Sequence, residues 1–165
     1  MVLDISRLIS NDGSSMDVSS EISFDTLSFN GQDISFNAPL KVKGTVRNND
    51  GLLCMDLECS ADYVSQCSRC LEPVGQKLDF TINEVFSKTG LENENDDVII
   101  LNSNEIDLKD IVEQSLCCFL PITCLCSEDC KGLCPDCGCN LNTETCSCET
   151  DDIDPRLAAL KDFLK

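Results

Sequence analysis

The residues of this 165-residue chain that are suited to chemistry are cysteines gathered in one short stretch. That stretch covers residues 126–148 and contains Cys126, Cys130, Cys134, Cys137, Cys139, Cys146 and Cys148. A Cys-x-x-Cys turn aims two sulfur atoms at one point, and Zn²⁺ takes four such ligands in tetrahedral geometry. Gly138 directly follows one such pair and gives the backbone freedom to turn toward sulfur. We therefore predict a closed structural zinc site formed by Cys134, Cys137, Cys146 and Cys148.

A second cysteine pair with ligand spacing, Cys67-Ser-Arg-Cys70, lies in the middle of the chain. A thioredoxin-like redox dithiol would require a βαβ context, which these β-rich surroundings do not provide. We predict instead that Cys67 and Cys70 meet Cys126 and Cys130 in a second four-cysteine site that fastens the tail to the β-rich part. A single zinc ion, and redox or metal-buffering chemistry of the thiols, remain alternatives. Packing roles are expected for Cys54, Cys59, Cys117 and Cys118, and no role is assigned to Cys124 and Cys139.

The composition limits the classes of function, because the net charge is −18. Such a charge favours a basic partner over non-specific binding to nucleic-acid phosphates. Histidine is absent, which excludes a histidine-based catalytic triad, and the acidic residues form no recognisable magnesium motif. A zinc ion held by four cysteines has no open position for a substrate. We therefore expect a protein without enzymatic activity and without a small-molecule substrate.

The sequence has no recognisable signal peptide and no stretch typical of a membrane span. The first residues lack the basic and apolar regions of a signal peptide, and no stretch approaches the roughly 18 consecutive apolar residues of a membrane span. We expect a cytoplasmic protein that does not associate with membranes. Thiols stay reduced in the cytosol, so the fourteen cysteines indicate metal ligands or small buried side chains in preference to disulfides.

Alternating apolar residues predict a β-rich domain over residues 1–121. Strands are expected within 22–29, along 34–46 with a break or edge at Pro39, and at 53–59, 78–86 and 98–101. The sequence Asn48-Asn49-Asp50-Gly51 is typical of a hairpin turn. The predicted fold class is α+β, mainly antiparallel β, as a meander forming a sandwich or a small barrel.

Helices are predicted in two places. Asp107 is suited to cap a helix that begins at Leu108 and is ended by Pro121. Asp154 is suited to cap a short C-terminal helix within 151–165. The acidic stretch 88–97 indicates a linker, and residues 122–150 form the predicted zinc-binding segment.

One predicted strand carries Lys41, Lys43 and Arg47 on its solvent-facing side. Such a face is compatible with an ordinary solubilising surface. The alternative is a small RNA-facing patch, with Arg69 of the Cys67–Cys70 turn beside it.

Several motifs occur here in a fixed order along the chain. They are Cys67-x-Arg69-Cys70-Leu71-x-Pro73, a helix ending in Leu120-Pro121, Cys126-Ser-Glu-Asp-Cys130-Lys-Gly-Leu-Cys134-Pro-x-Cys137-Gly-x-Asn-Leu-Asn, and Asp154-Pro155-Arg156-Leu157-Ala158-x-Leu160. Together, over roughly residues 20–165, they resemble the bacterial YceD family, also known as the DUF177 domain. The cysteine-rich tail resembles the Gram-positive branch of this family.

The resemblance implies a role in ribosome biogenesis. Members of the family are associated with the accumulation of large-subunit ribosomal RNA, and their genes commonly lie beside that of a small basic large-subunit ribosomal protein. Two hypotheses follow. The preferred one is an acidic, zinc-stabilised binding module for a basic ribosomal protein or for a pre-ribosomal large-subunit particle that contains one. The alternative is an assembly factor that binds ribosomal RNA directly through Lys41, Lys43, Arg47 and Arg69.

Overall fold

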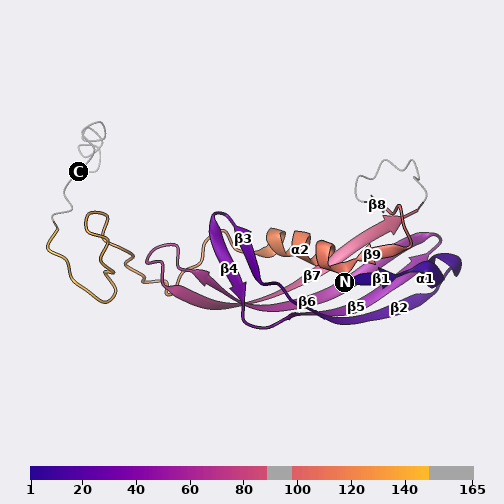
Figure 1. The fold of residues 1–165 in the computed structure, drawn as a ribbon, viewed down its shortest axis with the longest axis horizontal. Helices are drawn as coiled ribbons and strands as arrows, with labels where there is room; N and C mark the ends of the chain where they lie inside the picture. The colour runs from indigo at the N-terminus through magenta and orange to yellow at the C-terminus, as the bar shows by residue number, and fades with distance from the viewer. Residues whose placement is uncertain (89–97, 149–165) are drawn as a thin grey trace, which may run out of the picture.

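The structure is a computed structural model that describes residues 1–88 and 98–148 (Figure 1). Its elements are β1 (Val2–Asp4), α1 (Ser6–Ser10), β2 (Ser15–Ile22), β3 (Thr26–Phe29), β4 (Gln32–Phe36), β5 (Leu40–Asn49), β6 (Leu52–Gln66), β7 (Pro73–Ser87), β8 (Val98–Ile100), β9 (Glu105–Asp107) and α2 (Leu108–Phe119). The predicted fold class, α+β with mainly antiparallel strands, is confirmed.

The centre of the molecule is a seven-stranded sheet built around the long hairpin of β6 and β7. These two strands of 15 residues each pair antiparallel along their whole length. The other edge of β6 pairs first with β5 and then, near its far end, with β4. β2 and β3 extend the sheet beyond β5 and β4, and β8 pairs parallel with β7. As a result, the β6–β7 hairpin reaches beyond the other strands on the side away from α1 (Figure 1).

The predicted turn between β5 and β6 is confirmed. Asp50 and Gly51 both have positive φ angles, 54° and 84°, as a type I′ hairpin turn requires. The Asn48 side chain accepts a hydrogen bond from the Gly51 amide at 2.9 Å. Asn48 is itself buried and donates to the carbonyl oxygen of Leu8 at 2.7 Å, so the turn is held against α1.

Helix α2 and the small β1–β9 sheet lie on one face of the large sheet (Figure 1). The Asp107 side chain caps α2 by accepting from the Lys109 amide at 2.9 Å, and the helix ends before Pro121, as predicted. The buried stripe of α2 is Leu108, Val112 and Leu116. It packs in one core with the alternate residues of the sheet that point inward, among them Val42, Val46, Met55 and Leu57.

Several predicted elements occur with changed bounds. Residues 22–29 divide between the end of β2 and β3, and Pro39 lies in the break between β4 and β5. The structure adds β1, α1 and most of β2, which the sequence pattern did not indicate. The C-terminal helix expected after Asp154, and all of the expected linker except Lys88, lie outside the described residues.

The cysteines expected to pack in the domain fall into different environments. Cys59 is buried, whereas Cys54 and Cys117 are half-buried. Cys118 is exposed, contrary to the packing role expected of it, because it lies on the outer side of α2. Among the described residues, no helix has the length and apolar character needed to cross a membrane.

Candidate metal centre

The loop that joins β6 to β7 carries the first predicted ligand pair. Cys67 follows β6 directly, and its amide donates to the carbonyl oxygen of Glu72 at 2.8 Å. The Leu71 amide donates back to the carbonyl oxygen of Cys67 at 2.9 Å, and Leu71 takes a φ of 61°. This tight turn directs both thiols inward, so that Cys67 and Cys70 are 0% and 4% exposed.

The segment after α2 returns to this loop and pairs with it. The Ser68 amide donates to the carbonyl oxygen of Cys124 at 2.7 Å, and the Cys124 amide donates to the Ser68 hydroxyl at 3.2 Å. The Leu133 amide donates to the carbonyl oxygen of Arg69 at 3.0 Å. Gly132 makes this approach possible, because a Cβ atom there would lie 3.1 Å from the same carbonyl oxygen.

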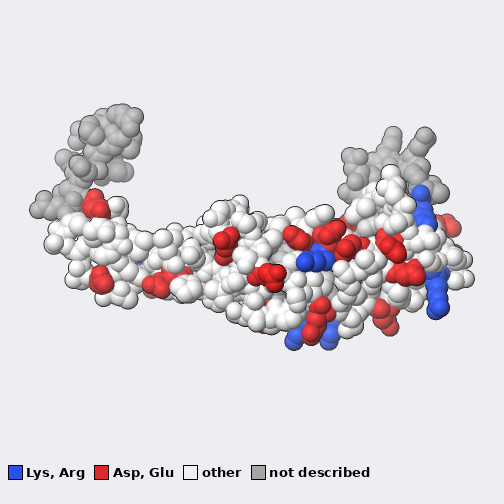
Figure 2. Space-filling view, viewed as in Figure 1, with Lys and Arg blue, Asp and Glu red and all other residues white. Residues whose placement is uncertain are grey.

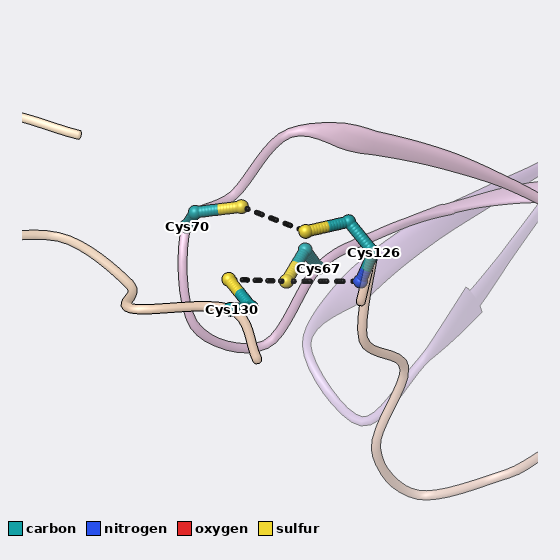
Figure 3. Close-up of side chains that lie close together, drawn as sticks. All are labelled: Cys67, Cys70, Cys126 and Cys130. Carbon is teal, nitrogen blue, oxygen red and sulfur yellow. Dashed lines mark hydrogen bonds between the residues drawn. The ribbon is translucent and has the colours of Figure 1, made fainter. Parts of the chain in front are cut away.

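These contacts bring together the four cysteines of the predicted hairpin–tail site, Cys67, Cys70, Cys126 and Cys130 (Figure 3). We call them the hairpin group. Their sulfur atoms all lie within 4.8 Å of one another. The distances are 3.8 Å from Cys67 to Cys130 and 3.6 Å from Cys70 to Cys126. A tetrahedron with Zn–S bonds of about 2.3 Å has sulfur–sulfur edges of about 3.8 Å. The hairpin group is therefore positioned to hold a metal ion, and its geometry fits zinc.

The electrostatic surroundings favour a thiolate at Cys67. Burial alone raises the pKa of this thiol, but the backbone amides of Cys70, Arg69 and Cys126 point at its sulfur and lower the pKa to about 6. The Cys126 amide lies 3.4 Å from the Cys67 sulfur. Amides directed at sulfur stabilise negative charge whether or not a metal is bound, so the turn is prepared for a thiolate ligand.

The pKa values of Cys130 and Cys126, in the same group, are shifted in opposite directions. Burial raises the pKa of Cys130, but the Asn142 side chain and the Gly132 amide outweigh burial and lower it. The neighbouring sulfurs of Cys130 and Cys70 raise the pKa of Cys126 to about 12. Four thiols so close together cannot all be ionised, because each added thiolate repels the others. A divalent cation removes this conflict by compensating the thiolate charge.

Arg69 fixes the tail part of the hairpin group. Its guanidinium donates to the carbonyl oxygens of Cys130 at 2.9 Å and Glu128 at 3.3 Å. The planar guanidinium thus spans the turn between the two tail ligands, Cys126 and Cys130. Arg69 therefore orders the ligand loop through hydrogen bonds, a role that the sequence did not indicate.

A second set of cysteines, which we call the tail group, lies farther along the tail. The sulfur atoms of Cys134, Cys137, Cys139 and Cys146 lie within 4.8 Å of one another. The Cys148 sulfur lies within the same limit of the Cys134 sulfur and of a carboxylate oxygen of Asp136. The Cys137 sulfur raises the pKa of both Cys139 and Cys148 to about 12. Cys148 therefore lies beside this four-sulfur group, near Cys134 and Cys137, and is a second candidate for the fourth ligand. The structure brings the predicted Cys134, Cys137 and Cys146 together and adds Cys139, which sequence reasoning left unassigned.

Comparison with known sequences identifies the family of this chain. Residues 55–164 match the profile of the family described as "Large ribosomal RNA subunit accumulation protein YceD". This region contains most of β6, all of β7 and α2, and every cysteine of the hairpin and tail groups. The chain belongs to the YceD family.

Two relatives illustrate the relationship. The chain is 35% identical over 109 residues to the uncharacterized protein Rv2926c of Mycobacterium tuberculosis. The aligned region covers 64% of this chain and 52% of the relative. It is 30% identical over 135 residues to the uncharacterized protein YlbN of Bacillus subtilis. That aligned region covers 81% of this chain and 78% of the relative. The YceD-family chain spans about half the length of the Mycobacterium tuberculosis relative. No solved structure matches it.

The predicted basic strand of this YceD-family chain is β5, and its cations lie among carboxylates. Lys41 stands opposite Glu21 of β2, and Lys43 stands opposite Glu58 of β6. Arg47 forms an ion pair with Asp56 at 3.7 Å. Arg69 is not part of this face, because it belongs to the β6–β7 loop. The structure thus brings together Lys41, Lys43 and Arg47 as one row and places Arg69 apart from them.

Asn142 is a further residue of the site that sequence reasoning missed. Its side-chain amide donates to the Cys130 sulfur at 3.4 Å, and its side-chain oxygen accepts from the Lys131 amide at 2.8 Å. Asparagine is common in loops, so its type alone gave no signal. Its position two residues after Asn140, in a tail already crowded with ligands, was the available hint.

Proposed function

We propose that this chain is a non-enzymatic factor of ribosome biogenesis that supports the accumulation of large-subunit ribosomal RNA in the cytoplasm. The observation that carries this proposal is the match of residues 55–164 to the YceD family profile, whose description names that process. The matched region contains both cysteine groups. The two cysteine groups and most of the long hairpin therefore belong to the part of the chain that relates it to this process.

A binding role suits the chemistry of the site better than catalysis does. A zinc ion in the hairpin group would have all four tetrahedral positions filled by protein sulfur, which would leave no position for water or substrate. Zinc bound there would act as a structural cross-link between the β6–β7 loop and the tail. The protein would then present a rigid surface whose shape depends on metal.

The surface charge favours a basic partner. In Figure 2 carboxylates are spread along the described chain, whereas the visible cations lie over the half that contains β2, β5 and α1. Even on the β5 face, each cation has a carboxylate on the same or the next cross-strand row. A polyanion such as RNA would meet these carboxylates first, and a lysine-rich protein would be drawn toward them. We infer that the partner is a basic large-subunit ribosomal protein, free or within a pre-ribosomal particle.

A binding assay with two matched sets of variants tests this inference. Neutralising Asp56, Glu58 and Asp79 should weaken binding of a basic large-subunit ribosomal protein, whereas reversing the charge of Lys41, Lys43 and Arg47 should preserve or strengthen it. Both sets lie on the same face of the sheet, so each controls for general damage to that face. The alternative, direct binding of ribosomal RNA, predicts the opposite: loss of RNA binding on reversal of the three cations. Binding of RNA alone, abolished by that reversal, would overturn the preferred partner.

A further inference from the structure

The tail group and the hairpin group share one loop. Asn142 lies in the segment between Cys139 and Cys146, which are both members of the tail group. Its side chain nevertheless contacts the hairpin group, because the side-chain amide donates to the Cys130 sulfur at 3.4 Å. A metal ion bound by Cys139 and Cys146 would close the loop that carries Asn142.

The backbone between the two groups is equally shared. The Leu141 amide donates to the carbonyl oxygen of Gly132 at 2.9 Å, and Leu133 forms an isolated antiparallel bridge with Asn140. Leu133 in turn donates to the carbonyl oxygen of Arg69, in the β6–β7 loop. A continuous set of hydrogen bonds therefore leads from the tail group, through residues 131–133, to the loop that holds Cys67 and Cys70.

The side chain of Asn142 is oriented for this contact by its neighbours. Its oxygen accepts from the Lys131 amide at 2.8 Å, and its amide nitrogen donates also to the Asn140 side-chain oxygen at 2.8 Å. One nitrogen thus lies near both Asn140 and the Cys130 sulfur. A donor at this distance stabilises negative charge on that sulfur.

Ordering such a loop costs conformational entropy. If the two groups bind metal independently, each binding event bears this cost. When the tail group binds first, the loop of Asn142 is already closed, and the hairpin group binds its metal without that cost. Groups that hydrogen-bond to metal ligands change metal affinity by about 10- to 100-fold. Coupling between binding sites is reciprocal, so a metal at the hairpin group raises the affinity of the tail group by the same factor.

We propose that the hairpin and tail groups are two cooperatively coupled metal centres and that Asn142 is the positioning residue that couples them. This inference rests on the metal-binding role proposed above. It extends that role, because two coupled centres load as a unit and a partly loaded chain is rare.

Cobalt titration of the reduced, metal-free full chain tests the coupling, since thiolate ligation of Co²⁺ is visible by absorption. Cys134→Ser with Cys137→Ser leaves the hairpin group, and Cys67→Ser with Cys70→Ser leaves the tail group. The two single-centre variants give one affinity each. The unsubstituted chain gives the overall affinity for two ions. The ratio of the overall constant to the product of the single constants is the coupling factor.

The expected coupling factor is about tenfold or more in the unsubstituted chain and markedly smaller in Asn142→Ala, in which only the backbone hydrogen bonds still join the two groups. Asn142→Ala should weaken the hairpin group in the full chain but change it little in the Cys134→Ser, Cys137→Ser chain, where the tail group cannot close the loop. The matched control is Thr145→Ala in the same loop, because no hydrogen bond of Thr145 occurs among the described residues. It should retain the full coupling factor.

The outcomes separate the two proposals. Two bound ions with a coupling factor of one would overturn the coupling and leave the metal centres standing. A factor that is unchanged in Asn142→Ala would overturn the role of this residue. Failure of the Cys134→Ser, Cys137→Ser chain to bind Co²⁺ at all would overturn the hairpin metal centre and the coupling together. Circular dichroism of each variant excludes loss of the β-sheet as the cause.

Discussion

The sulfur atoms of Cys67 and Cys130 lie 3.8 Å apart although 63 positions separate the two residues in the chain. One sulfur belongs to the tip of the β6–β7 hairpin, and the other belongs to the tail that follows α2. This contact makes the hairpin group a connection between distant segments. Substituting the cysteines of either segment would remove this connection.

Substitution of Cys67 and Cys70 by serine is expected to lower the zinc content of the reduced protein by one equivalent. The tail group does not use these residues, so it should keep its own ion. Elemental analysis before and after substitution measures the change. A zinc content that does not change would show that Cys67 and Cys70 are free thiols, and their redox chemistry would become the next hypothesis.

In the tail group, Cys139→Ser and Cys148→Ser are each expected to retain metal, whereas Cys134→Ser is expected to lose it. Cys139 and Cys148 both approach the Cys137 sulfur, so either one can provide the fourth ligand. Zinc analysis in the Cys67→Ser, Cys70→Ser background isolates this centre. Loss of the ion in only one of the two fourth-ligand variants would identify the true ligand and contradict the redundancy.

Gly132→Ala is expected to accelerate metal release from the hairpin group, and Gly138→Ala is the matched control. Both glycines have similar positive φ angles, 76° and 73°, so alanine introduces about 1–2 kcal/mol of backbone strain at either position. Only at position 132 would the added Cβ atom also press on the carbonyl oxygen of Arg69, at 3.1 Å. The release of zinc to a chromophoric chelator measures the difference, in the Cys134→Ser, Cys137→Ser chain in which the hairpin group alone binds metal. Equal rates in the two variants would contradict the importance of the Gly132–Arg69 approach.

The metal-free protein should become more stable as the pH rises from about 6 to 9. The folded chain holds the pKa of Cys67 at about 6, against an ordinary value of 9.0. Between these values the unfolded chain binds more protons at Cys67 than the folded chain, so the stability that this thiolate contributes grows with pH and is lost as the pH falls through about 6. Thermal unfolding of reduced, metal-free protein across this range measures the slope. The same slope in Cys67→Ser would refute this assignment.

Local sequence signals predicted the local features of the fold. The Asp50-Gly51 turn and the Asp107 cap each depend on a few neighbouring residues whose conformational preferences are strong. The alternation of apolar residues identified β5 and β6 for the same reason. Most of strand β2 is not predicted from the sequence, because its two buried residues, Val18 and Ile22, are separated by serines and an acidic residue. Its position is decided by pairing with β5, which is a long-range contact.

The candidate site shows the same division between local and long-range information. Ligand spacing was sufficient to propose that Cys67 and Cys70 meet Cys126 and Cys130, since few cysteines remained once the tail group was assigned. It selected Cys148 as the fourth tail ligand and left Cys139 unassigned, whereas the structure groups Cys139 with Cys134, Cys137 and Cys146. Nor does spacing reveal the structural role of Arg69, for which the sequence suggests a contact with RNA. Its guanidinium donates to two carbonyl oxygens of the tail, and only the folded backbone brings these together.

The hairpin group also has a small apolar environment of its own. Cys67, Cys70 and Cys130 pack with Val74, Leu125 and Leu133 in a cluster separate from the main core between the large sheet and α2. Exchanging or deleting ligands at the tip therefore disturbs few core contacts. For the evolution of such chains this means modularity: substitutions among the cysteines of the tip would leave the packing of the main core intact.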